Sequence, residues 1–267
     1  MSMFKSSNPT LAQKYFNTTY TNYASAQGLM TVRGTINKFG LLMIAVFVSA
    51  GFTWHLFNEG KQSTMMVLTF GGAIVGFILA LIMCFKPTAA RYIAPAYAIA
   101  EGLFLGGISV IINNAVNAQH ATDASGLANS GYNNIVMQAV GLTFGVAISM
   151  FLLYNFKIIK VTERFRSIII MATFGIAIFY LLSWIISLFG VNMNFAFGNS
   201  LMSIGISIFI VIIAALNLLL DFDMIEQNAS NGAPKYMEWF AAFGLLVTLV
   251  WLYLEILKLL SKINSRD

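Results

Sequence analysis

Seven long apolar stretches dominate this chain and limit what it can fold into. A helix needs about 20 apolar residues to cross the hydrocarbon core of a bilayer. Only 9% of the residues are charged, against roughly 25% in a soluble domain, and each stretch is continuous, unlike the alternating strands of a membrane β-barrel. The sequence therefore predicts an all-α integral membrane protein, a bundle of seven transmembrane helices within residues 33–267. The expected spans are about 39–57, 65–85, 93–112, 135–154, 168–190, 201–220 and 239–257.

Residues 1–32 are polar, and they lack the apolar core of a cleaved signal peptide. We expect a flexible arm there. With seven spans, eleven of the fifteen Lys and Arg residues fall on the side of this arm, and the positive-inside rule puts that side in the cytosol. Three of the other four, Lys258, Lys262 and Arg266, are close to the C-terminus, so a re-entrant last segment would leave the C-terminus cytosolic as well. The basic residues mark helix ends, and we expect the bilayer, not nucleic acid, as the partner.

Acidic residues inside the apolar stretches are the first candidates for function, because a charge at the bilayer centre costs about 2.5–3.5 kcal/mol. Glu101 lies well inside the third stretch. It is either a titrating or cation-contacting group, or a neutral acid hydrogen-bonded to a neighbouring helix. Glu255 lies in the seventh stretch, with Lys258 and Lys262 at i+3 and i+7. A local ion pair is one interpretation, and a partner across the bundle is the other.

A second group of polar residues lies at the end of the sixth stretch. Asn217 and Asp221 are four residues apart, so they share a helix face. Asp223 and Glu226 follow just beyond the apolar residues. Together they form either a negatively charged cytosolic vestibule that attracts cations or ordinary solvated acids at the water boundary.

Enzyme motifs are not found. The sequence contains no H-E-x-x-H zinc motif and no G-x-S-x-G nucleophile elbow. The single cysteine, Cys84, rules out a disulfide framework or a thiolate cluster, and we expect it to be a small core residue. Asp221 and Asp223 are two residues apart on one segment, unlike the facing aspartates of a membrane protease. We therefore expect no enzymatic activity and no tightly bound cofactor.

Small residues recur at a spacing that lets membrane helices approach closely. The pattern predicts a compact bundle. The three matches are Gly72-x-x-x-Gly76, Gly102-x-x-x-Gly106 and Gly141-x-x-x-Gly145.

Three motifs together carry a family resemblance: Ala94-Pro95-Ala96-Tyr97-Ala98 leading into Glu101-Gly102-Leu103-Phe104-Leu105-Gly106, then Leu220-Asp221-Phe222-Asp223, and finally Leu252-Tyr253-Leu254-Glu255. Over about residues 8–263 the chain resembles the bacterial branch of the Bax inhibitor-1-like family. The resemblance implies a seven-helix bundle with the last helix at its centre. It also implies a protein of the bacterial inner membrane that leaks calcium in a pH-dependent way.

In that family two aspartates on the sixth and seventh helices share a proton. By motif, Asp221 matches the first, and Glu255 matches the second with Glu in place of Asp. The family's arginine on the second helix has no counterpart, since residues 65–85 contain no base, so a different partner, or none, is implied. A seventh helix starting near Trp239 would carry Glu255 about 24 Å from its start, deep for a partner of Asp221. Glu238 is the substitute.

The resemblance thus implies a pH-sensitive calcium or cation leak channel gated by a carboxylate pair. Two close carboxylates cannot both ionise easily and titrate as a unit, and Ca²⁺, the expected transported ion, prefers carboxylate oxygens. The alternative is a non-conducting regulator that binds other membrane proteins, such as a membrane protease or a stress-response partner. The proton-sensing or ion-binding candidates are Asp221, Glu255, Glu101, Asn217, Asp223 and Glu238, with Asp221 and Glu255 as the metal contacts.

Overall fold

The computed structural model describes residues 28–120, 135–189, 198 and 200–265. These residues include seven helices that are long and apolar enough to cross a membrane, which confirms the predicted fold class. Most of the predicted arm, residues 1–32, lies outside the described part of the chain. The helices are α2 (Val32–Asn58), α3 (Gln62–Phe85), α4 (Ala90–His120), α5 (Ile135–Asn155), α6 (Glu163–Leu188), α8 (Leu201–Ser230) and α9 (Met237–Asn264), with a short 3-10 turn, η2 (Pro87–Ala89), before α4.

Several helices extend beyond their apolar stretches. The start of α2 is fixed by Thr31, whose side chain accepts a hydrogen bond from the backbone N–H of Gly34 at 3.0 Å. α8 continues well past residue 220, so Asp223 and Glu226 lie on the helix and not beyond it. The buried side chain of Ile225 continues the apolar face through this last part of α8, which explains why the helix does not end at the first acid.

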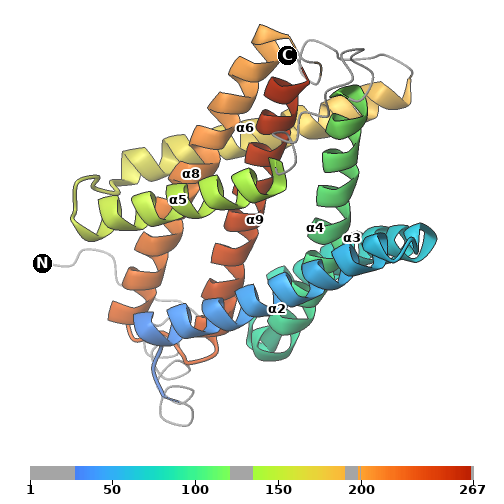
Figure 1. Ribbon diagram of the computed structural model, residues 1–267. Helices are drawn as coiled ribbons and strands as arrows, with labels where there is room; N and C mark the ends of the chain where they lie inside the picture. The colour runs from blue at the N-terminus through green and yellow to red at the C-terminus, as the bar shows by residue number, and fades with distance from the viewer. Residues whose placement is uncertain (1–27, 121–134, 190–197, 199, 266–267) are drawn as a thin grey trace, which may run out of the picture.

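The last helix occupies the centre of the bundle. α9 contacts α8, α2, α5 and α4, and its buried residues extend from Glu238 to Leu257. α2, α3 and α4 pack together on one side of it, while α5 and α6 pack against α8 on the other. Figure 1 shows α8 and α9 side by side, with α2 crossing them at a large angle. The central helix expected from the resemblance is thus present.

The segment before α2 is fastened to the turn between α8 and α9. Leu29 pairs with Pro234 in an isolated antiparallel bridge. The Met30 N–H donates to the carbonyl of Ala233 at 2.8 Å. The start of α2 and the start of α9 are therefore held together on the same face of the bundle.

Two of the three glycine patterns mark close helix contacts. A Cβ added to Gly102 would lie 2.4 Å from the Val46 carbonyl, and one added to Gly106 would lie 2.5 Å from the Ala50 carbonyl. In α3, a Cβ on Gly72 would lie 2.6 Å from a backbone carbonyl of α4. The third pattern is different, because a Cβ on Gly141 or Gly145 would meet nothing within 4 Å. Close approach therefore joins α4 to α2 and α3, while the glycines of α5 face open space.

The outer surface of the bundle is apolar, as expected for contact with lipid chains. On α3, large side chains including Phe70, Ile74 and Phe77 are exposed. Cys84 is exposed too, so its expected place in the core was wrong. A small apolar side chain fits the lipid-facing side of a membrane helix equally well, and the hydrophobic sequence around Cys84 does not distinguish the two.

Candidate functional site

Apart from Glu101, which lies between α4 and α3, the polar residues predicted from the sequence lie on α8 and α9. The two helices run in opposite directions. Near one end, the Lys262 ammonium of α9 donates to the hydroxyls of Ser203 and Ser207 on α8, at 2.7 and 2.9 Å. Further along, Thr248 of α9 lies against Asp221 of α8. These contacts fix which residues of the two helices face each other.

Asp221 is the least satisfied acid of the described chain. One of its carboxyl oxygens, Oδ2, is fully buried and has no hydrogen-bond partner among the described residues. Among the described residues, the Thr248 side chain is the polar neighbour of the Asp221 carboxyl group, and no basic side chain pairs with this carboxyl group. A buried carboxylate without a counter-charge is costly. Asp221 is therefore stable in this place when a proton or a cation neutralises it.

Asn217, one helical turn before Asp221, faces α6. Its Nδ2 donates to the Thr173 hydroxyl and to the Ile213 carbonyl, both at 2.8 Å. The amide thus links α8 to α6 and caps one of the backbone carbonyls of its own helix. Asn217 and Asp221 lie one turn apart on α8, as predicted. Their side chains nevertheless contact different helices, α6 for Asn217 and α9 for Asp221.

Glu255 lies in a polar cluster between α6, α8 and α9. The Tyr180 hydroxyl is 3.0 Å from each of its carboxylate oxygens, and the Lys258 ammonium is 3.1 Å from Oε1. The same ammonium lies 4.9 Å from the centre of the Tyr180 ring. Lys262 joins these residues around a cavity of about 250 Å³. Both expected kinds of partner are present, the local lysine and a group from across the bundle.

The structure does not bring Asp221 and Glu255 together. The residue of α9 that faces Asp221 is Thr248, which precedes Glu255 by seven residues, or about 10 Å along the helix. No hydrogen bond joins the two carboxyl groups in the described structure. The direct carboxylate pair suggested by the resemblance is therefore not formed here, because the seventh helix starts at Met237 and carries Glu255 past the level of Asp221.

The expected metal contact shared by Asp221 and Glu255 stays a prediction, and the separation of the two carboxyl groups does not support it. Glu255 is already neutralised by lysine, and Asp221 lies at another level of the interface. Among the residues that the structure describes, no group of three or more His, Cys, Asp or Glu side chains could hold a metal ion. The two carboxylates thus lie at separate levels of the α8–α9 interface.

Glu238, the substitute partner, has a different set of neighbours. It is completely buried and accepts hydrogen bonds from the backbone N–H and the hydroxyl of Thr31, both at 2.9 Å. The ammonium groups of Lys38 and Lys235 pair with its two oxygens. Glu238 therefore fastens the start of α2 to the start of α9, and its contacts do not include Asp221.

The two acids near the end of α8 are bound by neighbouring helices. The Arg166 guanidinium of α6 lies 2.6 Å from Asp223, and the Tyr154 hydroxyl of α5 donates to Glu226. Of the two interpretations left open, a charged vestibule or solvated acids, neither describes these contacts fully. The acids tie α8 to its two neighbours near the same face as the α8–α9 turn.

Glu101 lies where α4 meets α3. Its neighbour on the same helix is the Tyr97 hydroxyl, with which it hydrogen-bonds. Gly76 of α3 faces it, and a Cβ there would lie 3.3 Å from the Glu101 Oε2 atom. The hydrogen bond of Glu101 is made to its own helix and not to the neighbouring helix that one interpretation expected, so the choice between the two roles stays a prediction.

Several functional residues were missed by reasoning from the sequence. Tyr180 and Arg166 on α6 and Tyr154 on α5 bind three of the acids, yet nothing in the linear spacing connects them. Asn113 on α4 was also overlooked, although its Oδ1 is buried without a partner among the described residues. Polar residues within apolar stretches, Tyr included, were the signal that could have found them.

Comparison with known families gave one match. The model of the family described as Bax inhibitor 1 like matches residues 8–265, nearly the whole chain. Comparisons with curated proteins and with solved structures gave no significant match.

Proposed function

The chain belongs to the Bax inhibitor 1 like family, and from that premise we propose that it is a pH-sensitive leak pathway for Ca²⁺ and other cations with Asp221 as its proton-responsive group. The family is associated with cation and calcium leak across membranes and is not a family of enzymes. The seven apolar helices make the chain a multi-pass membrane protein. We place the protein in the inner membrane of a bacterium, as the family resemblance implies, with the N-terminus on the cytosolic side that the distribution of basic residues favours.

The observation that carries the proposal is the unpartnered Oδ2 atom of Asp221. Native proteins rarely leave a buried polar atom unsatisfied, and such an atom calls for an explanation in strain, function or an unseen ion. An ionisable group within a membrane helix is a functional candidate by default. Asp221 meets both criteria at the interface of α8 with the central helix, where a change of charge acts directly on helix packing.

Two charge states of Asp221 then have different consequences. The neutral carboxyl is compatible with the apolar contact of α8 and α9. The carboxylate requires a counter-charge or water, which separates the helices or draws a cation to the oxygen. Carboxylate and carbonyl oxygens are the ligands that Ca²⁺ prefers. Proton occupancy of a single acid thus couples pH to the passage of a cation, without a second acid at contact distance.

Glu255 has a structural role in this proposal. Tyr180 and Lys258 occupy both of its oxygens, and Lys262 adds a second positive charge beside the same cavity. Two ammonium groups beside one carboxylate repel a divalent cation more than they attract one. We assign Glu255 to the docking of α6 on α9, in place of the shared-proton partner implied by the resemblance.

The test is calcium flux into dye-loaded liposomes that contain only the purified protein, at pH 6 and pH 8. Wild-type flux is expected to depend on pH. Asp221→Asn keeps the shape of the neutral carboxyl but cannot ionise, so its flux should be equal at both pH values and should match the wild-type flux in the protonated state. Glu255→Gln is the matched control, and it should keep the pH dependence whatever its absolute flux.

The outcomes separate the alternatives. If Asp221→Asn retains the wild-type pH dependence, Asp221 is not the proton-responsive group. If the dependence is lost in Glu255→Gln instead, the pair implied by the resemblance forms in a state different from this one. Absence of flux above empty liposomes, with a monodisperse folded protein, would favour the non-conducting regulator.

A further inference from the structure

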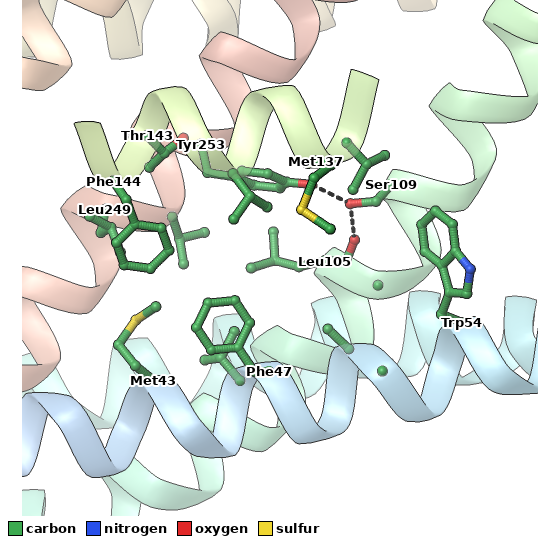
Figure 2. A pocket seen from close by; sticks show the side chains of 17 residues that line it. Met43, Phe47, Trp54, Leu105, Ser109, Met137, Thr143, Phe144, Leu249 and Tyr253 are labelled. Carbon is green, nitrogen blue, oxygen red and sulfur yellow. Dashed lines mark hydrogen bonds between the residues drawn. The ribbon is translucent and has the colours of Figure 1, made fainter. Parts of the chain in front are cut away.

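A long apolar groove separates α2 from α5. Both helices pack on α9, and the rings of Phe47 on α2 and Phe144 on α5 stack across the groove with their centres 5.9 Å apart. Figure 2 shows one part of it, a cavity of about 390 Å³. Met43 and Trp54 of α2 lie at its rim, and Tyr253 of α9 lies behind.

The hydroxyl groups in this cavity are already hydrogen-bonded within the protein. The Ser109 and Tyr253 hydroxyls bond to each other at 2.6 Å, and Ser109 also lies 2.5 Å from the Leu105 carbonyl. The Thr143 hydroxyl donates to the carbonyl one turn earlier in its own helix. Apart from Trp54, whose indole carries one N–H donor, all other lining side chains are apolar. The occupant that fits is therefore a hydrocarbon chain, which needs no hydrogen bond.

The groove continues along both helices toward the start of α2. A second cavity of about 510 Å³ shares Phe144 and Leu249 with the first. It extends to Val32 at the start of α2 and to Tyr154 at the end of α5. From Val32 to Trp54, α2 rises about 33 Å, and one leaflet of a bilayer core is about half of its roughly 30 Å thickness. The two cavities together are therefore long enough to hold an acyl chain along α2.

The end of the groove near Val32 opens into a basic mouth. A third cavity of about 320 Å³ shares Tyr154, Asn155 and Glu226 with the second, and it is also lined by Lys157 and Lys160. Both lysines are exposed, and neither pairs with a carboxylate among the described residues. Glu226, the one acid in the mouth, accepts the hydrogen bond of Tyr154. Two lysines against one carboxylate leave the mouth positively charged.

We propose that this groove binds a phospholipid with an anionic headgroup, its phosphate between Lys157 and Lys160 and an acyl chain along the apolar face of α2 and α5. The charge of the mouth matches a phosphate, and basic residues near a membrane surface attract anionic lipids. The apolar length behind it matches the chain. This inference concerns a binding site apart from Asp221, and it holds whether or not the protein conducts ions.

The test is native mass spectrometry of the intact protein in mild detergent, titrated with phosphatidylglycerol or phosphatidylcholine. Wild type should retain phosphatidylglycerol and bind phosphatidylcholine more weakly. The double variant Lys157→Gln and Lys160→Gln should bind phosphatidylglycerol roughly 30-fold more weakly. Lys86→Gln is the control for charge alone, because Lys86 is an exposed base outside the three cavities, and it should bind as wild type does.

A second pair of variants tests the apolar part without touching the lysines. Gly51 lines the first cavity, and a Cβ added there would meet nothing within 4 Å. Gly51→Phe should fill the groove and weaken binding of phosphatidylglycerol, whereas Gly71→Phe, at an equally open position outside the cavities, should not. Equal binding of both lipids, or loss of binding in the control variants to the same degree, would overturn the proposal.

Discussion

Replacing Gly106 by alanine tests the close approach of α4 to α2. The added Cβ would lie 2.5 Å from the carbonyl oxygen and 2.8 Å from the Cα atom of Ala50, and 2.8 Å from the hydroxyl of Thr53. Ordinary contacts of a carbon atom are about 3.5–4.0 Å. Because two of these neighbours are backbone atoms, no change of side-chain rotamer can relieve the overlap, and the two helices must separate by about 1 Å.

Gly145→Ala provides the matched comparison. It lies in the middle of α5, and a Cβ there would meet nothing within 4 Å. Alanine favours a helix over glycine by up to about 1 kcal/mol, and this gain is common to both variants. Overpacking costs about 1–3 kcal/mol and affects only Gly106→Ala. The difference in free energy of unfolding between the two variants should therefore be about 1–3 kcal/mol in favour of Gly145→Ala.

Thermal unfolding of the two variants in the same detergent, followed by tryptophan fluorescence, measures this difference. For a protein of this size 1 kcal/mol corresponds to about 2–4 °C in Tm, so Gly106→Ala should melt several degrees below Gly145→Ala. Equal melting temperatures would refute the reasoning, because they would mean that α4 and α2 do not approach as closely as the structure places them.

Three further variants test the ion pairs and hydrogen bonds between helices by the same unfolding measurement. Glu238→Gln should lower the free energy of unfolding by about 1–3 kcal/mol, because Lys38 loses the charge of its buried partner; an unchanged Tm would contradict the anchoring role of this acid. Arg166→Gln should cost about 1 kcal/mol, since it removes the ion pair between α6 and α8, and added salt should reduce the difference from wild type. Tyr180→Phe should cost about 1–3 kcal/mol because Glu255 loses the hydrogen bond that the single Tyr180 hydroxyl shares between its two oxygens, and stability equal to wild type would show that the hydroxyl is replaceable by water.

The number and class of the helices followed from the sequence because a bilayer imposes one length and one composition on every span. The helix ends did not follow, since α8 includes Asp223 and Glu226 and continues to Ser230. Apolar runs report where a helix meets lipid, whereas the hydrogen bonds that prolong it depend on neighbouring helices. Tyr154 and Arg166 satisfy those two acids only after three helices have packed.

In the candidate site too, contacts within one helix could be predicted from the sequence, whereas contacts between helices could not. The ion pair of Glu255 with Lys258 was predictable because three residues of helix fix its geometry. The position of Thr248 next to Asp221 was not predictable, because it depends on the register of α8 against α9. Likewise the glycine spacing is identical in α4 and α5, yet only the glycines of α4 face a neighbouring backbone. Spacing identifies a possible contact face but not the direction in which that face points.

The anchor of α2 has a consequence for how the protein is made. Thr31 and its acceptor Glu238 are separated by 207 residues along the sequence, and the paired residues Leu29 and Pro234 are almost as far apart in the sequence. A ribosome delivers α2 to the membrane long before it synthesises Pro234 or Glu238. The start of α2 therefore has no native partner while the five helices between α2 and α9 are inserted. The bundle closes at this face only when α9 emerges, because Lys38 has no native carboxylate partner until Glu238 has been synthesised.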